Sequence, residues 1–282
     1  MKQNRKRFLL LWLCICVVLL VGALAAPGGG ESETIQEAMR DAVLHETNQI
    51  SLFGLRSVNP GYISSLVVTV VLLVAALLIR VFVIPRFQYV PGKFQMLLEQ
   101  AVGMFDGLAK SNSPWRNGFL GAYVFAAGAY IFTGTLFELF GFQAIATNGN
   151  SVTLPAPLSD VNGAIMLGVL SYLVIFSGAI AGNGIRGIGS ALKEISLLIS
   201  MSFRLFGALL SGLLVTELVY YYIQLSFVLP VLVGVLFTLL HALIQSYVLT
   251  MLTALFYGEM SERKERHPKA RKKRAGEPLQ NV

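Results

Sequence analysis

The sequence predicts an all-α polytopic membrane protein with five transmembrane helices, preceded by an N-terminal signal peptide or extra helix. Of the 282 residues, 55% are hydrophobic and only 13% are charged, whereas soluble domains carry about 25% charged residues. Several apolar runs approach the roughly twenty residues that a helix needs to cross a bilayer. Nothing between these runs is long enough for a soluble domain, so residues 61–262 are predicted to form one membrane domain.

The N-terminal region has two interpretations. Residues 1–26 combine a basic start, an apolar run and small residues after it, which is the plan of a cleaved signal peptide. The same pattern also fits a retained extra transmembrane helix. Either way, residues 27–60 are predicted to lie on the outer side of the membrane, with a short amphipathic helix over 34–48. His45 in that helix is expected at the surface.

The first two predicted spans cover residues 62–84 and 118–140. Pro85 and Arg86 are expected to close the first span on the inner side. Residues 94–110 have apolar side chains at helical spacing but are too polar to cross, so this helix is expected to lie along the membrane surface. Glu138 falls near the outer end of the second span, where an acid is either hydrated or marks an ion path.

The third predicted span covers residues 161–181 and follows an outer loop over 147–160. Asp160 and Asn162 at its start could cap the helix. Residues 183–190, which are rich in glycine, are expected to form a cytoplasmic turn.

The last two spans are predicted to be long helices over 191–223 and 229–257. Because they hold more residues than the about 20 that a perpendicular span needs, they are expected to be strongly tilted. Basic residues cluster at both ends of the chain, and the positive-inside rule places both ends in the cytoplasm. The basic tail over 263–282 is expected to be disordered and to attract acidic membrane lipid rather than nucleic acid.

Arg204 is a single charge in the middle of a long apolar run. An arginine at that depth costs about 2.5–3.5 kcal/mol on insertion scales, and it cannot shed its charge. The plainer interpretation is an arginine that snorkels to the surface from a helix end, but Arg204 is central rather than terminal. The sequence therefore indicates an intramembrane charge that faces an ion path.

Several short segments match one membrane protein family in the right order along the chain. They are Val90-Pro91-Gly92-Lys93-Phe94-Gln95, Asp160-Val161-Asn162, Ser202-Phe203-Arg204-Leu205-Phe206-Gly207 and Gln245. Together they resemble the a subunit of F-type ATP synthase, over about residues 34–262. The resemblance implies a multi-pass protein of a bacterial inner membrane. It also implies partners, namely the c-ring and the b subunits of the peripheral stalk. No catalytic centre, cofactor, metal or direct nucleotide binding is expected in the chain itself.

The resemblance also implies roles for particular residues. In that family an arginine separates two proton half-channels and keeps the passing ring carboxylate ionised, and here this role falls to Arg204. Gln245 would orient Arg204 by a hydrogen bond, or would simply join two helices. Ser196 and Ser200 share a helix face with Arg204, so they could line the inner half-channel or favour close helix contact. The candidates for lining the outer half-channel are Glu138, Asp160 and Asn162.

The chain departs from the family pattern at three positions, Ala208, Leu213 and Thr238. Relatives usually carry Asn at the first, an acid at the second, and a histidine or acid at the third. Glu217 lies one turn beyond the second position, and His241 lies four residues before Gln245 on the same helix face. We predict that Glu217 and His241 supply the titratable pair one turn displaced, with Glu217 acting on the outer half-channel. A plain interhelical hydrogen bond is an equally open interpretation of His241.

A secondary transporter that binds an anionic substrate through Arg204 is the alternative function. No internal repeat or matched pair of broken helices supports it. The sequence contains no P-loop, zinc-protease motif or Gly-rich dinucleotide turn. Cys14 and Cys16, in the first apolar run, are interpreted as small apolar residues rather than as a disulfide or metal site. The arginine is compatible with either proton or sodium coupling, and protons are the default of the family.

Overall fold

The computed structural model confirms the predicted fold class, because helices account for nearly all regular structure. It describes residues 50–52, 56–115, 117–145, 151–221 and 234–262, together with positions 14, 17, 18 and 21. The predicted helix over 34–48, most of residues 1–26 and the tail over 263–282 lie outside the described residues.

Five helices of the described residues are long and apolar enough to cross a membrane, as predicted. They are Pro60–Arg86, Gly118–Phe140, Val161–Asn183, Ile195–Val215 and Gly234–Ser261. The first consists of α3 (Pro60–Leu78), η1 (Ile79–Val83) and η2 (Ile84–Arg86). Its last turns loosen because Pro85 has no N–H to donate, and the Ile84 N–H donates to the Ile79 carbonyl in π-helical fashion.

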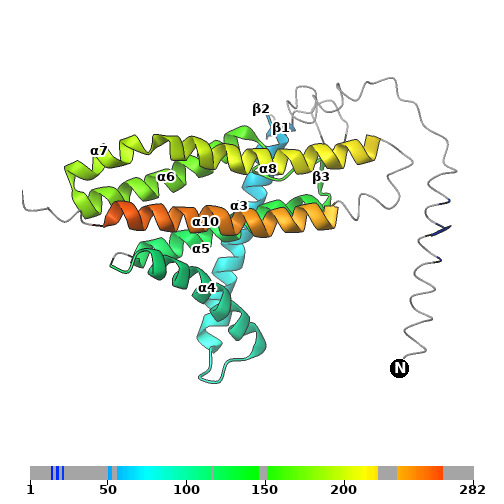
Figure 1. Cartoon of the computed structure of the whole chain (residues 1–282). Helices are drawn as coiled ribbons and strands as arrows, with labels where there is room; N and C mark the ends of the chain where they lie inside the picture. The colour runs from blue at the N-terminus through cyan, green and yellow to red at the C-terminus, as the bar shows by residue number, and fades with distance from the viewer. Residues whose placement is uncertain are drawn as a thin grey trace, which may run out of the picture.

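The other four spans form a bundle of helices lying side by side (Figure 1). They contain α5 (Gly118–Phe137), α6 (Val161–Asn183), α8 (Ile195–Tyr221) and α10 (Leu239–Ser261). Successive helices run in opposite directions along the bundle, whereas α3 crosses it (Figure 1). Helix α3 and the bundle therefore cannot both stand upright in one membrane. This crossing agrees with a strong tilt of the last two helices, which stays a prediction.

Shorter elements connect the spans. Helix α4 (Lys93–Asn112) packs against α5 and α10, η3 (Glu138–Phe140) extends α5, and η4 (Gly234–Thr238) leads into α10. Two antiparallel hairpins were not predicted. They pair β1 (Ile50–Leu52) with β2 (Arg56–Val58), and β3 (Gln143–Ile145) with β4 (Ser151–Thr153).

The predicted turn over 183–190 is wrong. Gly184 alone turns the chain, in a left-handed conformation with φ of 59°, and α7 (Ile185–Lys193) follows directly. Glu194 then ends α7 before α8 begins, so the predicted helix over 191–223 is two helices. The glycines suggested a loop, but only one of them occupies a backbone conformation that favours glycine.

Small residues allow the helices to approach closely. A Cβ built at Gly168 on α6 would collide with the Ser202 hydroxyl on α8, and one at Gly258 on α10 would collide with the Asn112 carbonyl of α4. Such close backbone approach is typical of helix packing in membranes. The core of the bundle includes the buried side chains of Leu120, Val124, Ile131, Ile175, Met201, Leu205 and Leu249.

Candidate functional site

Arg204 lies in the middle of α8, and its side chain is exposed. Its neighbours Met201 and Leu205 are buried in the bundle core, so α8 directs Arg204 away from that core. Within the described part of the chain, no hydrogen bond or ion pair involves the guanidinium. A permanent charge on an apolar helix therefore needs a partner that this part of the chain does not supply.

One stripe of α8 is uncovered, and we call it the open face of α8. It consists of the exposed residues Ser196, Ser200, Arg204, Gly207 and Ser211. Their spacing of three or four positions places them on one side of the helix. The residues of this stripe other than Arg204 are small, exposed Ile199 and Phe203 flank it, and a Cβ built at Gly207 meets no atom within 4 Å. A surface of this kind lets another helix approach closely.

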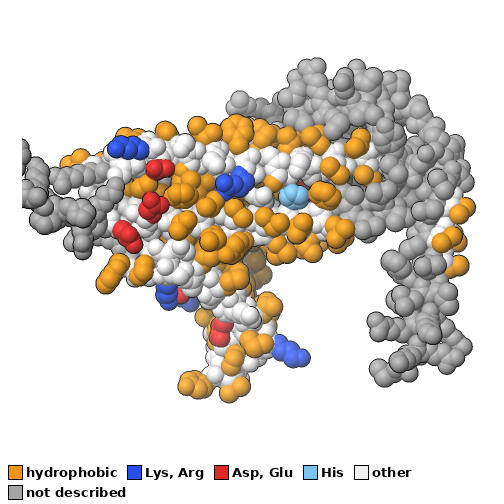
Figure 2. Space-filling view, viewed as in Figure 1, with side chains coloured by type: hydrophobic (Ala, Val, Ile, Leu, Met, Phe, Trp, Pro, Cys, Tyr) orange, Lys and Arg blue, Asp and Glu red, His pale blue; other side chains and the backbone are white. Residues whose placement is uncertain are grey.

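Figure 2 shows the bundle from the same side as Figure 1. Hydrophobic side chains cover most of this side, as expected of a surface that contacts lipid. A basic side chain and a histidine lie in its middle stretch, whereas acidic side chains of the bundle gather near the end that carries α7 (Figure 2). The middle of this side therefore carries cationic and titratable groups within an apolar surface.

A small cavity of about 10 Å³ lies between α5, α8 and α10, and we call it the His241 cavity. Its lining includes Thr135, Glu138, Ala208, Gly212, Thr238 and His241. Ala208 and Thr238 are positions at which the chain departs from the family pattern. The small side chains of Ala208 and Thr238 leave a space that Glu138 and His241 also line.

Two contacts hold the His241 ring in place. Its Nδ1 lies 2.7 Å from the Phe237 carbonyl oxygen, and its ring stacks on that of Phe237 with the centroids 5.8 Å apart. A carbonyl oxygen only accepts, so Nδ1 carries the hydrogen and donates it. In the neutral ring, Nε2 is then the atom that can accept a proton.

The His241 cavity also fixes the level of Gln245 relative to Arg204. Helices α8 and α10 contact each other and run in opposite directions. One turn back along α8 from Ala208 leads to Arg204, and one turn forward along α10 from His241 leads to Gln245. Both steps go the same way along the bundle, so Arg204 and Gln245 lie at the same level.

Gln245 is only 7% exposed, and its Oε1 has no hydrogen-bond partner. The predicted hydrogen bond to Arg204 is therefore not formed through this atom. A buried acceptor left unpaired costs about 1–3 kcal/mol. At the same level of the bundle, α8 carries Arg204, whose N–H donors have no partner in the described part of the chain. After a change of rotamer, the guanidinium could donate a hydrogen bond to the Gln245 Oε1.

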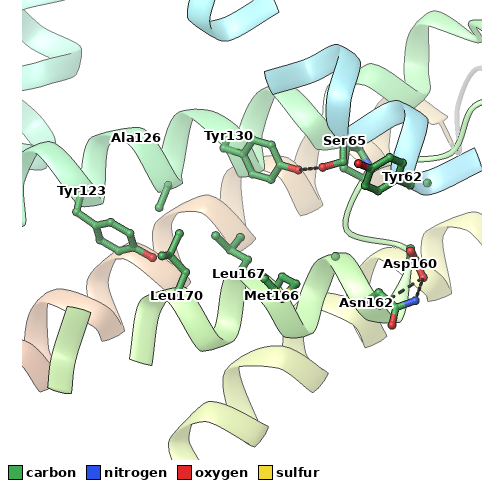
Figure 3. Close-up of a pocket in the computed structure, with 14 residues that line it drawn as sticks. Tyr62, Ser65, Tyr123, Ala126, Tyr130, Asp160, Asn162, Met166, Leu167 and Leu170 are labelled. Carbon is green, nitrogen blue, oxygen red and sulfur yellow. Dashed lines mark hydrogen bonds between the residues drawn. The ribbon is translucent and has the colours of Figure 1, made fainter. Parts of the chain in front are cut away.

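Asp160 and Asn162 line a different cavity from His241. The Asp160 carboxylate caps α6 by accepting from the Asn162 backbone N–H at 3.3 Å, which is the capping role that the sequence left open. Both residues line a cavity of about 530 Å³ between α3, α5 and α6, which we call the tyrosine cavity after Tyr62, Tyr123 and Tyr130 (Figure 3). The structure therefore does not bring Asp160 and Asn162 together with His241.

Two further residues complete the comparison with the sequence. Glu217 lies in the helical part of α8, but its side chain falls outside the described residues, so the Glu217–His241 pair stays a prediction. Sequence reasoning missed Thr135 and Gly212. Thr135 lies three positions before Glu138 on the same helix face, which was an available signal, whereas a glycine in an apolar helix gave none.

Fold and site together define a class: a polytopic membrane protein with an arginine on an open face of an apolar helix, unpaired among the residues that the structure describes. A family model described as ATP synthase A chain matches residues 63–258. The chain belongs to this family. It is therefore a multi-pass membrane component of an ATP synthase, with a part in ion transport and ATP synthesis.

Two curated relatives agree with the family. The chain is 26% identical over 198 residues to ATP synthase subunit a of Cereibacter sphaeroides, an alignment that covers 66% of this chain and 75% of that protein. It is 24% identical over 201 residues to ATP synthase subunit a of Histophilus somni, with 59% and 76% covered.

Proposed function

We propose that this chain forms the stationary side of the proton path in the Fo membrane sector, next to a rotating ring of c subunits. The observation that carries the proposal is Arg204, an exposed guanidinium on an apolar helix with no partner in the described part of the chain. A carboxylate on a ring subunit satisfies that charge. The small residues of the open face of α8 let ring helices approach and slide past.

The charge of Arg204 separates the release of a proton by the ring carboxyl from the uptake of the next one. An adjacent positive charge favours the ionised form of a carboxyl group, so a ring carboxyl loses its proton before it passes Arg204. It takes up a new proton only on the other side. The fixed charge also repels free cations and so blocks a direct leak between the two half-channels.

The remaining polar residues line the two half-channels. Ser196 and Ser200, on the open face of α8, line the inner one. His241 and Glu217 form the titratable pair of the outer one. Additional candidates for the outer lining are Glu138, Asp160 and Asn162. Gln245 orients Arg204 in the assembled complex: its Oε1 is unpaired in this structure and lies at the level of Arg204, so a change of rotamer would let it accept from the guanidinium.

The charge distribution also orients the chain. Lys93 and Lys110 of α4 and Lys193 of α7 belong to the connections on one side of the membrane, and residues 141–160 on the other side contain no Lys or Arg. By the positive-inside rule, the α7 end and the C-terminal tail are cytoplasmic, and residues 27–60 are outside. Helix α3 stays largely uncovered by its own chain, with 6% of its span window buried, which leaves it open to lipid and to peripheral-stalk b subunits.

The first test compares Arg204→Ala with the native chain in inverted membrane vesicles that contain the whole complex. We expect ATP-driven proton pumping and ATP synthesis to be abolished, while the soluble head still hydrolyses ATP. Arg80→Ala is the matched control, because Arg80 is an exposed arginine near the end of the first span, and it should pump normally. Unchanged pumping in Arg204→Ala would show that Arg204 is not the barrier and would overturn the proposal.

The titratable pair needs its own test. We expect Glu217→Gln and His241→Ala each to lower proton-driven ATP synthesis, because each removes a group that exchanges protons. If both variants synthesise ATP at the native rate, the pair has no role in the path, whatever the result for Arg204.

A further inference from the structure

The tyrosine cavity, of about 530 Å³ between α3, α5 and α6, is lined mainly by apolar groups. They include Ala126, Ala127, Pro157, Met166, Leu167 and Leu170. Met166 and Leu170 are 67% and 50% exposed, so the cavity opens on the surface of the spans rather than into the bundle core. An occupant can therefore enter it sideways from the membrane.

The deep part of the cavity offers little to water. The Tyr130 hydroxyl is paired with that of Ser65 at 2.9 Å, and the Tyr123 hydroxyl is paired with that of Ser171 at 2.8 Å. A buried water molecule needs about two to four polar partners, and these hydroxyls already have theirs. The deep part therefore suits a hydrocarbon chain better than water.

The rim of the cavity, at the starts of α3 and α6, is polar and negatively charged. A Cβ built at Gly61 would lie 2.9 Å from the Asp160 Cβ, so the two helix starts touch there. Asp160 lies at this end of the cavity and Tyr123 at the other (Figure 3). The carboxylate accepts from Asn162 through Oδ1, and among the described side chains no Lys or Arg pairs with it. The rim therefore offers a carboxylate to a cation from outside the chain.

The dimensions of the cavity match one acyl chain. Leu170 lies ten residues beyond Asp160, which is about 15 Å along a helix and half of the roughly 30 Å hydrocarbon core. The cavity therefore reaches no further than the membrane midplane, which is the depth of a single leaflet. A helix about 10 Å wide would fill roughly 1,200 Å³ over that length, more than twice the cavity volume of about 530 Å³.

We infer that the tyrosine cavity binds one phospholipid with an ammonium headgroup, such as phosphatidylethanolamine. Its place in the outer leaflet rests on the orientation given in the proposed function, whereas the site itself does not depend on Arg204. One acyl chain lies along the apolar lining, and the ammonium group donates to the Asp160 carboxylate.

The carboxylate at the rim selects the headgroup. Lipid tails are as apolar as leucine, so the apolar lining alone does not distinguish one phospholipid from another. The Asp160 charge attracts an ammonium group and repels a lipid whose headgroup is only anionic. Because Asp160 lies at the rim, lipid in the cavity leaves its place among the candidates for the outer half-channel unchanged.

The experiment uses phosphatidylethanolamine with a photoreactive diazirine in one acyl chain, added to vesicles that hold the whole complex. After illumination, the labelled peptides of this chain are mapped and their yield is measured at equal amounts of complex. We expect label within residues 123–130 of α5 and 166–170 of α6, which contribute to the cavity lining. Excess unlabelled phosphatidylethanolamine should compete, whereas phosphatidylglycerol, which has an anionic headgroup, should not.

Two variants test the two parts of the site. Ala126→Phe fills the cavity from α5, and we expect it to lower the labelling at least about tenfold. Ala122→Phe is the matched control, because Ala122 is exposed one turn earlier on the same helix and does not line the cavity. Asp160→Asn removes the charge but keeps a good helix cap, and labelling should fall about fivefold, as for one partly exposed ion pair. Glu259→Gln, at an exposed acid on α10, should label normally.

Several outcomes would overturn the site. Label spread evenly over the exposed faces of α3, α5 and α6 would show that no lipid is held, and absence of label from the cavity in the complex would show that another subunit covers it. Equal competition by phosphatidylglycerol, or native labelling in Asp160→Asn, would overturn the ammonium headgroup. If Ala126→Phe lowers assembly, Asp160→Asn decides. Arg204→Ala should label normally, so the lipid site and the proposed function fail by different results.

Discussion

Polar side chains on the two sides of the α5–α6 pair differ in whether they find hydrogen-bond partners within the chain. On the α3 side, two tyrosine hydroxyls are paired within the chain: Tyr130 with Ser65 at 2.9 Å (Figure 3), and Tyr123 with Ser171 at 2.8 Å. On the α8–α10 side, the Arg204 guanidinium has no partner in the described part of the chain, and the Gln245 Oε1 has none either.

This difference separates structure from function. Within a bilayer core no water satisfies an unpaired polar group, so each one carries a cost. On the α3 side, the hydroxyls of Tyr123 and Tyr130 are satisfied within the chain itself. Under the proposed function, the α8–α10 side is completed by a ring subunit, and its unpaired groups mark where that subunit would act. Four predictions test this division.

The largest effect is expected from Arg204→Lys, which keeps the charge but loses the planar fork of donors. A lysine does not offer a carboxylate two parallel hydrogen bonds. We expect ATP-driven proton pumping to fall at least about a hundredfold, or about 2.7 kcal/mol. Lys193→Arg, at an exposed position of α7, is the reciprocal control and should pump normally. Near-native pumping in Arg204→Lys would mean that a positive charge at this position is sufficient and that the planar guanidinium is not needed.

A second prediction concerns the close contact between Gly168 on α6 and Ser202 on α8. Gly168→Leu forces a side chain into the Ser202 hydroxyl, and overpacking of this kind costs about 1–3 kcal/mol. We expect a lower thermal midpoint of the purified complex and less of the chain in the membrane. Gly189→Leu is the control, because a Cβ there meets no atom within 4 Å. Equal midpoints for the two variants would show that α8 does not depend on this contact.

The sequence was sufficient for the features that follow from hydrophobicity alone. The five spans were predictable because each needs only a long apolar run. Arg204 stood out because a charge in such a run is costly wherever the helix packs. The cap at Asp160 was likewise a local feature, since its acceptor and donor are two positions apart.

Features that depend on packing between distant segments were not predictable. The His241 cavity joins α5, α8 and α10, and no local pattern sets the register among them. The sequence predicted a turn where α7 lies, because glycines are common in loops. In the structure, however, Gly187 lies inside the helix and allows its backbone to approach the Ala179 carbonyl closely. The unpaired state of Gln245 also required the structure, because a sequence does not reveal which polar groups find partners.

A third prediction separates stability from function at Gln245. Gln245→Leu replaces a buried, unpaired acceptor with an apolar side chain of similar size. The free energy of unfolding of the chain purified without partners should therefore rise by about 1 kcal/mol. Proton pumping by the assembled complex should nevertheless fall, because Arg204 loses its orienting partner. Ser246→Ala is the control, since that hydroxyl is already bonded to the Leu243 carbonyl at 3.0 Å, and it should not stabilise the chain. A Gln245→Leu chain that is less stable would show that the amide is satisfied after all.

The smallest effect is expected on the paired side. Tyr130→Phe removes only a hydroxyl that is bonded to Ser65, and such bonds between membrane helices are worth about 0.6 kcal/mol. We expect a small decrease in the thermal midpoint and no change in proton pumping, with Tyr123→Phe behaving alike. Pumping that falls while the midpoint hardly moves would mean that the tyrosine cavity carries protons. Asp160 and Asn162, which line that cavity, would then belong to the path, and the division between a structural and a functional side would fail.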